Sequence, residues 1–239
     1  MLAVEGNEVS RPEHIGSLFN DYGDRDQTSE PKALEQIQKR NGLALIFHPG
    51  RYIRENDPRS DYWYEYLFLK YGHAPLIGME VFNQGIRYEG DKDLWDRLNA
   101  LIIPDMVIFG YSNDDMHRLR HLYRNYQFML MDKLTDEALK DTMHKGSFYF
   151  CYEYEGSGEI IPPVPLIEKI EVTNHGAIIT ITASNASTIK WLTENGVVGS
   201  GHAINLNALG LDKDKFIRVE LTNDFGITCL QPFAIGYYE

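Results

Sequence analysis

Histidine and acidic residues follow several short apolar runs of this chain, where they could bind divalent metal ions together. Glu8 is followed six residues later by His14, and His48 stands between a run of five apolar residues and a Pro-Gly turn. Asp115 and His117 form an Asp-x-His pair shortly after another apolar run. Carboxylate oxygens and imidazole nitrogens bind divalent ions that activate water and neutralise phosphoryl groups. These five residues form one candidate metal site; the alternative is that Glu8 is a solvated loop acid and His14 a surface histidine.

Two polar residues beside this candidate site could contact a substrate. Arg51 follows His48 by three residues, and a guanidinium in that place could bind a phosphate oxygen bidentately. A surface ion pair with Glu55 or Asp57 is the alternative role for Arg51. Asn83 ends an apolar, strand-like run and offers a neutral hydrogen-bonding group. Both residues are therefore candidates for substrate binding.

Glu80 is an unusual acid because it lies within that apolar run and not at its end. Burying an unpaired carboxylate costs several kcal/mol, so Glu80 must meet a cation, a hydrogen-bond donor or solvent. We expect structural pairing of Glu80 in preference to metal ligation.

Short apolar runs alternate with amphipathic segments from Met1 to Tyr154, which predicts an α/β domain with a mainly parallel sheet. In barrels of this class, reactive side chains project from the carboxyl ends of several strands, which would bring the candidate residues together. The strands are expected at 2–8, 43–47, 76–82, 106–109 and 127–131. The helices are expected at 30–40, 58–70, 93–102 and 135–144.

A change in composition predicts a second domain. Residues 155–165 contain two glycines and three prolines, which interrupt both helices and strand ladders, so this segment is expected to be a linker. Short strand-like runs follow at 166–172, 177–183, 187–193, 197–204, 216–222 and 226–233. Their spacing favours a small all-β, immunoglobulin-like sandwich over residues 166–239, with Trp191 in its core.

The order of these motifs resembles the polymerase and histidinol phosphatase (PHP) family of metal-dependent phosphoesterases. The matching motifs are a Gly-x-Glu strand end at Glu8, the following His14, a Phe-His-Pro turn at His48, Gly-x-Glu-Val-x-Asn at 78–83 and Ser-Asn-Asp-Asp-x-His at 112–117. The resemblance covers roughly residues 3–150, and family members with a comparable tail carry a sandwich that ends in a segment like 228–233.

The resemblance implies a distorted (β/α)7 barrel over residues 1–154, with up to three Mn, Zn, Fe or Mg ions at one end. Such enzymes hydrolyse phosphomonoesters or phosphodiesters with metal-activated water. Glu8 would bridge metal ions, and the remaining ligands would be His14, His48, Asp115 and His117, with Asp114 outside the set.

One departure from the family pattern concerns the beginning of the chain. Family members open with strands that bear His-x-His and Asp-His motifs, and the residues before Glu8 are too few to hold them. We therefore expect an incomplete barrel in a truncated chain, with fewer metal ions and impaired activity. Exposed sheet edges would then favour a homo-oligomer.

Composition limits the classes of partner. Among 239 residues, 23 are basic and 35 acidic, and the net charge of −12 disfavours nucleic acid and anionic membranes. The resemblance to the PHP family implies a phosphorylated small molecule as the partner. No apolar run is long enough to span a bilayer and no signal peptide is visible, so we expect a soluble protein; the appended sandwich favours export over the cytoplasm. Cys151 and Cys229 are expected to be free thiols.

A noncatalytic function is the alternative hypothesis. The sandwich could recognise a carbohydrate or a protein surface while the first domain serves as a scaffold. Clustering of His48 with Asp115 and His117 would favour metal chemistry, and their dispersal would favour binding.

Overall fold

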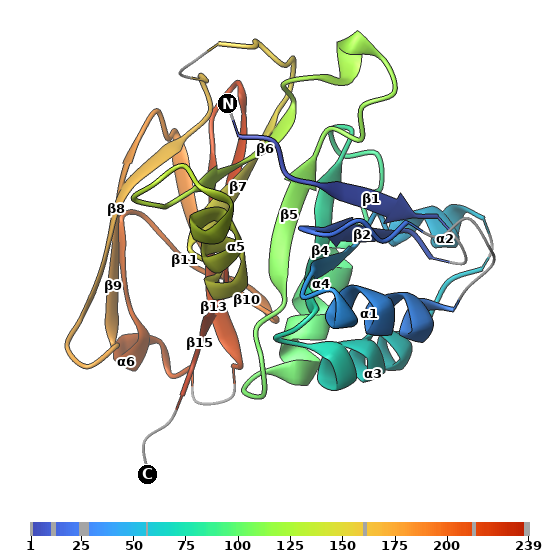
Figure 1. Ribbon diagram of the computed structural model, residues 1–239. Coiled ribbons are helices and arrows are strands. Elements are labelled where there is room, and N and C mark those ends of the chain that lie inside the picture. Colours follow the sequence, from blue (N-terminus) through green and yellow to red (C-terminus); the bar gives the residue numbers. More distant parts are fainter. Residues whose placement is uncertain are drawn as a thin grey trace.

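The chain folds into a mixed α/β structure with three sheets, seen in a computed structural model that describes residues 2–10, 13–23, 29–55, 57–159, 162–211 and 214–236. In Figure 1 the helices α1, α3 and α4 lie on one outer side, strands β8 and β9 lie on the other, and the remaining strands run between them. None of the helices in the described ranges combines the length and apolar character that crossing a bilayer requires.

A five-stranded sheet in the order β1-β2-β3-β4-β5 forms the first layer. Its strands are β1 (Gly6–Val9), β2 (Ile15–Leu18), β3 (Leu43–Ile46), β4 (Leu76–Asn83) and β5 (Phe109–Asn113). The pairs β3/β4 and β4/β5 are parallel, whereas β1/β2 and β2/β3 are antiparallel. The helices beside this sheet are α1 (Glu30–Lys39), α3 (Asp61–Tyr71) and α4 (Asp91–Ile102). Their apolar faces share one buried core with the strands.

Two antiparallel sheets form the other layers. The larger has the order β11-β10-β13-β14-β7-β6, with β15 paired to β13, and the smaller has the order β12-β9-β8. Their strands are β6 (Asn125–Met129), β7 (Phe148–Glu153), β8 (Leu166–Thr173), β9 (Ile178–Ser184), β10 (Thr188–Thr193), β11 (Gly196–Ser200), β12 (Ala203–Asn205), β13 (Phe216–Thr222), β14 (Gly226–Leu230) and β15 (Phe233–Ala234). Trp191 is fully buried in the core of these sheets, as expected.

Short helical segments complete the described structure: α2 (Gly50–Arg54), a 3-10 turn η1 (Leu119–His121), α5 (Asp136–Lys145) and α6 (Leu206–Leu209). Helix α5 shows both of its boundaries in the sequence. Thr135 caps the start by accepting a hydrogen bond from the backbone of Ala138, and Gly146 ends the helix in the left-handed conformation.

Several strand predictions need correction. The first strand begins at Gly6 and not at Leu2, and β5 begins at Phe109, where the expected strand ended. Strands β2 and β7 were not expected, and the run 197–204 divides into β11 and β12, which belong to different sheets. The parallel pattern expected up to Tyr154 holds only for β3, β4 and β5, because β1 and β2 form an antiparallel hairpin.

The larger antiparallel sheet includes strands from both sides of the expected linker. Strand β7 precedes the segment 155–165, β14 follows it, and the two pair with Cys151 opposite Thr228. Strand β6, expected in the α/β sheet, pairs antiparallel with β7 instead. The division into domains at 1–154, 155–165 and 166–239 therefore stays a prediction, and one continuous sheet spans both sides of the segment between them.

Side-chain amides and one buried arginine join the first sheet to the larger antiparallel sheet. Gln231 accepts a hydrogen bond from the backbone of Gly110 at 2.8 Å and donates to its carbonyl at 2.9 Å, and so caps the edge strand β5. Arg218, 1% exposed, forms two 2.7 Å contacts with Asp96 on α4 and lies over Trp95. These contacts hold β5 and α4 against the larger antiparallel sheet.

Both cysteines are free and buried, as expected. They lie on the adjacent strands β7 and β14. Burial raises the pKa of Cys151 to about 12, so the reactive thiolate form is scarce at neutral pH.

Asp91 at the start of α4 is a buried acid with a perturbed pKa. Burial raises its pKa to about 8, against a hydrogen bond from the backbone of Gly50, and the negative charge of Glu80 adds to the increase. Between the ordinary pKa of an aspartate, about 4, and pH 8, the folded state therefore holds more protons than the unfolded state. The contribution of Asp91 to the free energy of unfolding is present at low pH and is lost as the pH rises through 8.

We expect the free energy of unfolding of Asp91→Asn to change less with pH than that of the wild type. Between pH 5 and pH 8, the free energy of unfolding of the wild type should fall by about 1 kcal/mol or more relative to that of the variant. Denaturant titrations at the two pH values measure the difference, and Asp105→Asn, at an exposed aspartate just beyond α4, is the control. Equal pH dependence of the wild type and Asp91→Asn would contradict the raised pKa.

Candidate metal centre

The β1/β2 hairpin brings Glu8 and His14 together, although they are six residues apart. Glu8 lies on β1, and His14 directly precedes β2, so the antiparallel pairing returns the chain to the same end. Glu8 Oε1 lies 2.5 Å from His14 Nδ1 and accepts a hydrogen bond from Ser10 Oγ at 3.1 Å. The backbone N–H of His14 donates to the Tyr52 hydroxyl at 2.7 Å, which fixes the loop before β2.

The pKa of Glu8 reflects this pairing. Burial acts to raise it, but the hydrogen bond from His14 and the charges of His14 and His48 leave it below the usual value for a glutamate. Glu8 is therefore ionised at neutral pH, which is the state in which a carboxylate binds a cation.

His48 lies two residues beyond the end of β3, where Pro49 and Gly50 begin helix α2 in place of the expected turn, and Glu80 sets its orientation. Glu80 is 2% exposed, and its Oε2 accepts hydrogen bonds from the His48 backbone N–H at 2.7 Å and from the ring Nδ1 at 3.0 Å. Asn113 donates to the other oxygen, Oε1, at 2.6 Å, and Asn83 Nδ2 lies 3.2 Å from Oε2. The expectation that Glu80 meets hydrogen-bond donors is confirmed.

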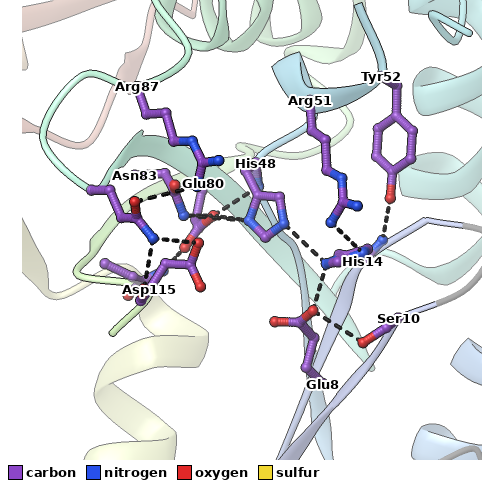
Figure 2. Close-up of polar contacts among 12 residues, drawn as sticks. Glu8, Ser10, His14, His48, Arg51, Tyr52, Glu80, Asn83, Arg87 and Asp115 are labelled. Carbon is purple, nitrogen blue, oxygen red and sulfur yellow. Dashed lines mark hydrogen bonds and ion pairs between the residues drawn. The ribbon is translucent and has the colours of Figure 1, made fainter. Parts of the chain in front are cut away.

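One potential metal-ligand atom from each of Glu8, His14 and His48 lies close to the other two. His48 Nε2 lies 3.0 Å from His14 Nδ1, and one ligand atom from each of the three residues lies within 4.8 Å of the others. Figure 2 shows His48 between Glu80 on one side and His14 on the other. Because Glu80 accepts from Nδ1 of His48, the lone pair of His48 remains on Nε2, which faces His14 and Glu8.

Asp115 and His117 line the same cavity but stand apart from this triad. The cavity has a volume of about 370 Å³. Its lining consists of Glu8, His14, His48, Arg51, Arg54, Glu55, Arg87, Tyr88, Asp115 and His117. All five candidate ligands therefore line one cavity, and for three of them, Glu8, His14 and His48, one ligand atom from each lies within 4.8 Å of the others.

Asp115 is held on the opposite wall of the cavity by Gln84. The Gln84 amide donates to the Asp115 carbonyl at 2.8 Å and to its carboxylate at 3.1 Å, while His117 Nδ1 lies 3.3 Å from Oδ1. The His117 side chain is 69% exposed. Asp114 has a structural role, since its carboxylate accepts hydrogen bonds from the backbone N–H groups of residues 123–125.

The two candidate substrate-binding residues differ in their surroundings. Arg51 lines the cavity, with Nη1 at 2.8 Å from His14 Nε2 and Nε at 2.8 Å from Glu55 Oε1, so the surface ion pair considered as its alternative role is also present. Asn83 is 2% exposed and is not among the residues that line the cavity. Its amide lies beside Glu80 and His48, and a contact between Asn83 and a substrate stays a prediction.

The cavity is also lined by three residues that were not predicted from the sequence: Arg54, Arg87 and Tyr88. Arg54 follows Arg51 by three residues in the short helix α2, and this helical spacing was a usable signal. Arg87 and Tyr88 follow β4 in the loop before α4, where nothing in the local sequence distinguishes them from surface residues.

Comparison with known proteins finds a structural relative. No family model matches the sequence, and no curated protein matches it. Among solved structures, the chain is similar to a two-domain protein from Bacteroides vulgatus ATCC 8482 that contains a predicted PHP-like metal-dependent phosphoesterase. The TM-score is 0.52 with 14% sequence identity, over 98% of this chain and 68% of that chain. At this level of identity the likeness establishes a shared fold alone.

Proposed function

We propose that this protein is a metal-dependent phosphoester hydrolase in which Glu8, His14 and His48 hold a divalent ion. The observation that carries the proposal is the convergence of one carboxylate oxygen and two imidazole nitrogens within 4.8 Å of one another. The relative's description as a two-domain protein with a predicted PHP-like phosphoesterase supports the same class of reaction. The proposed architecture is an incomplete PHP-type barrel joined to an immunoglobulin-like sandwich.

The donor set fits a divalent ion such as Mn, Zn, Fe or Mg. Three protein ligands leave positions open for water and substrate, which is the arrangement of catalytic sites. Glu80 supports His48 as carboxylates support metal-binding histidines, by fixing the tautomer and the ring orientation. When bound, the ion supplies a Lewis acid that lowers the pKa of water and offsets the charge of a phosphoryl group.

The contact between Arg51 and His14 depends on which ring nitrogen of His14 carries the proton. An arginine can only donate, so its contact with His14 Nε2 places the proton of neutral His14 on Nδ1. For Nδ1 to act as a ligand, that proton must move to Nε2, which then no longer accepts from Arg51. The freed guanidinium would be available to a phosphate oxygen, the role suggested by its place in the sequence.

The remaining candidate residues and the substrate also have proposed roles. Asp115 and His117 contribute to metal binding from across the cavity, and Asn83 contributes to substrate binding. The substrate is a phosphorylated small molecule, and turnover is slow because, among the described residues, one ligand atom from each of three of the five candidate ligands lies within 4.8 Å of the others.

Metal stoichiometry tests the triad. After incubation with MnCl2 and desalting, we expect about one ion per wild-type chain by elemental analysis, and loss of that ion in His14→Ala and in His48→Ala. His175→Ala, which removes an exposed histidine of the sandwich, should retain the metal. Manganese-dependent hydrolysis of p-nitrophenyl phosphate should follow the metal content. Equal retention in all variants would place the ion elsewhere.

Glu80→Gln tests the support of His48. The amide keeps the shape of the side chain but removes the negative charge that binds the Nδ1 proton, so we expect metal affinity to fall about 10- to 100-fold. Competition with a chelator measures the affinity, and Glu153→Gln, at a buried glutamate outside the cavity, is the matched control. An unchanged affinity in Glu80→Gln would show that His48 does not depend on this carboxylate.

A further inference from the structure

Two arginines converge on one aromatic ring in the wall of the metal cavity. Arg54 comes from α2 and Arg87 from the loop after β4, and both line the cavity together with Tyr88. Their guanidinium carbons lie 5.5 Å and 5.3 Å from the centre of the Tyr88 ring. Both arginine side chains are exposed, whereas Tyr88 is 8% exposed. Two solvent-accessible guanidinium groups therefore lie close to one buried aromatic ring.

The acids of the cavity are already engaged by other groups. Glu8 pairs with His14, Glu55 with Arg51, and Asp115 with Gln84 and His117. Within the described ranges, neither Arg54 nor Arg87 forms an ion pair with a carboxylate. The arginine pair therefore adds two positive charges that no neighbouring acid of the cavity neutralises, in a protein whose net charge is −12.

Tyr88 links this pair to the candidate metal centre. Its ring stacks on His48, with 5.9 Å between ring centres and an angle of 20° between the planes. Arg87 is also fixed from the other side, since its Nη1 donates to Gln84 Oε1 at 3.2 Å and Gln84 in turn holds Asp115. The arginine pair is thus built onto the residues that form the two walls of the cavity.

We propose that Arg54 and Arg87 bind a second anionic group of the substrate, so that the enzyme acts on small phosphorylated molecules that carry another phosphate or a carboxylate. The assignment of the substrate class rests on the proposed function, whereas the anion site itself requires no metal. A planar guanidinium binds phosphate or carboxylate oxygens through paired hydrogen bonds, and both arginines line the same cavity, where they can offer such bonds to an anionic group. A local positive field also attracts an anion that the rest of the acidic surface repels.

Binding without metal tests the anion site separately from catalysis. In EDTA, we expect wild-type protein to bind inorganic pyrophosphate in a calorimetric titration, and the double variant Arg54→Gln/Arg87→Gln to bind it at least tenfold more weakly. Lys32→Gln/Lys190→Gln removes two exposed lysines outside the cavity and should bind like the wild type. No binding by the wild type, or equal binding by both double variants, would overturn the proposal.

A pair of matched substrates tests the substrate class. With Mn²⁺, wild-type kcat/KM should be at least tenfold higher for fructose 1,6-bisphosphate than for fructose 6-phosphate, and the arginine double variant should lose most of this ratio. Hydrolysis of both at equal rates would overturn the substrate class. If neither is hydrolysed but pyrophosphate binding still depends on the arginines, the anion site stands and the proposed hydrolase function is what fails.

Discussion

The carboxylate of Glu80 is the constraint around which the site is built. It lies in the middle of β4 at 2% exposure, where an unpaired charge would cost several kcal/mol. Hydrogen bonds from the backbone and ring of His48, from Asn83 and from Asn113 satisfy it, and these residues lie at the ends of β3, β4 and β5. The need to satisfy one buried acid therefore fixes the carboxyl edge of the parallel strands and turns Nε2 of His48 toward Glu8 and His14.

The second layer of the structure keeps that edge in place. Strand β5 ends the first sheet, and an edge strand leaves backbone groups unpaired. Gln231 satisfies Gly110, and Ser112 donates to the carbonyl of Cys151 at 2.6 Å, so strands of the larger sheet complete β5. Asn113, one residue later, is then held where it can donate to Glu80. The larger antiparallel sheet thus supports the site without lining its cavity.

The place of His48 and the pairing of Glu80 could be predicted from the sequence, whereas several strands and their pairing could not. His48 was recognisable because five apolar residues lead to it and a Pro-Gly turn follows, and the pairing requirement of Glu80 followed from its place inside an apolar run. Strand β2 was missed because Gly16 and Ser17 interrupt its apolar pattern. The pairing of β7 with β14 joins segments more than seventy residues apart, and no local pattern encodes such a contact. Convergence of Arg54 and Arg87 on Tyr88 likewise depends on tertiary structure.

Anomalous diffraction from crystals soaked in MnCl2 tests the central claim most directly. The account predicts a manganese peak within coordination distance of Glu8 Oε1, His14 Nδ1 and His48 Nε2, with the Glu80 contact to His48 Nδ1 retained and Arg51 withdrawn from His14. A peak at other residues, or no peak in crystals that hold Mn²⁺ in the solvent at millimolar concentration, would contradict the assignment of this triad as a metal centre.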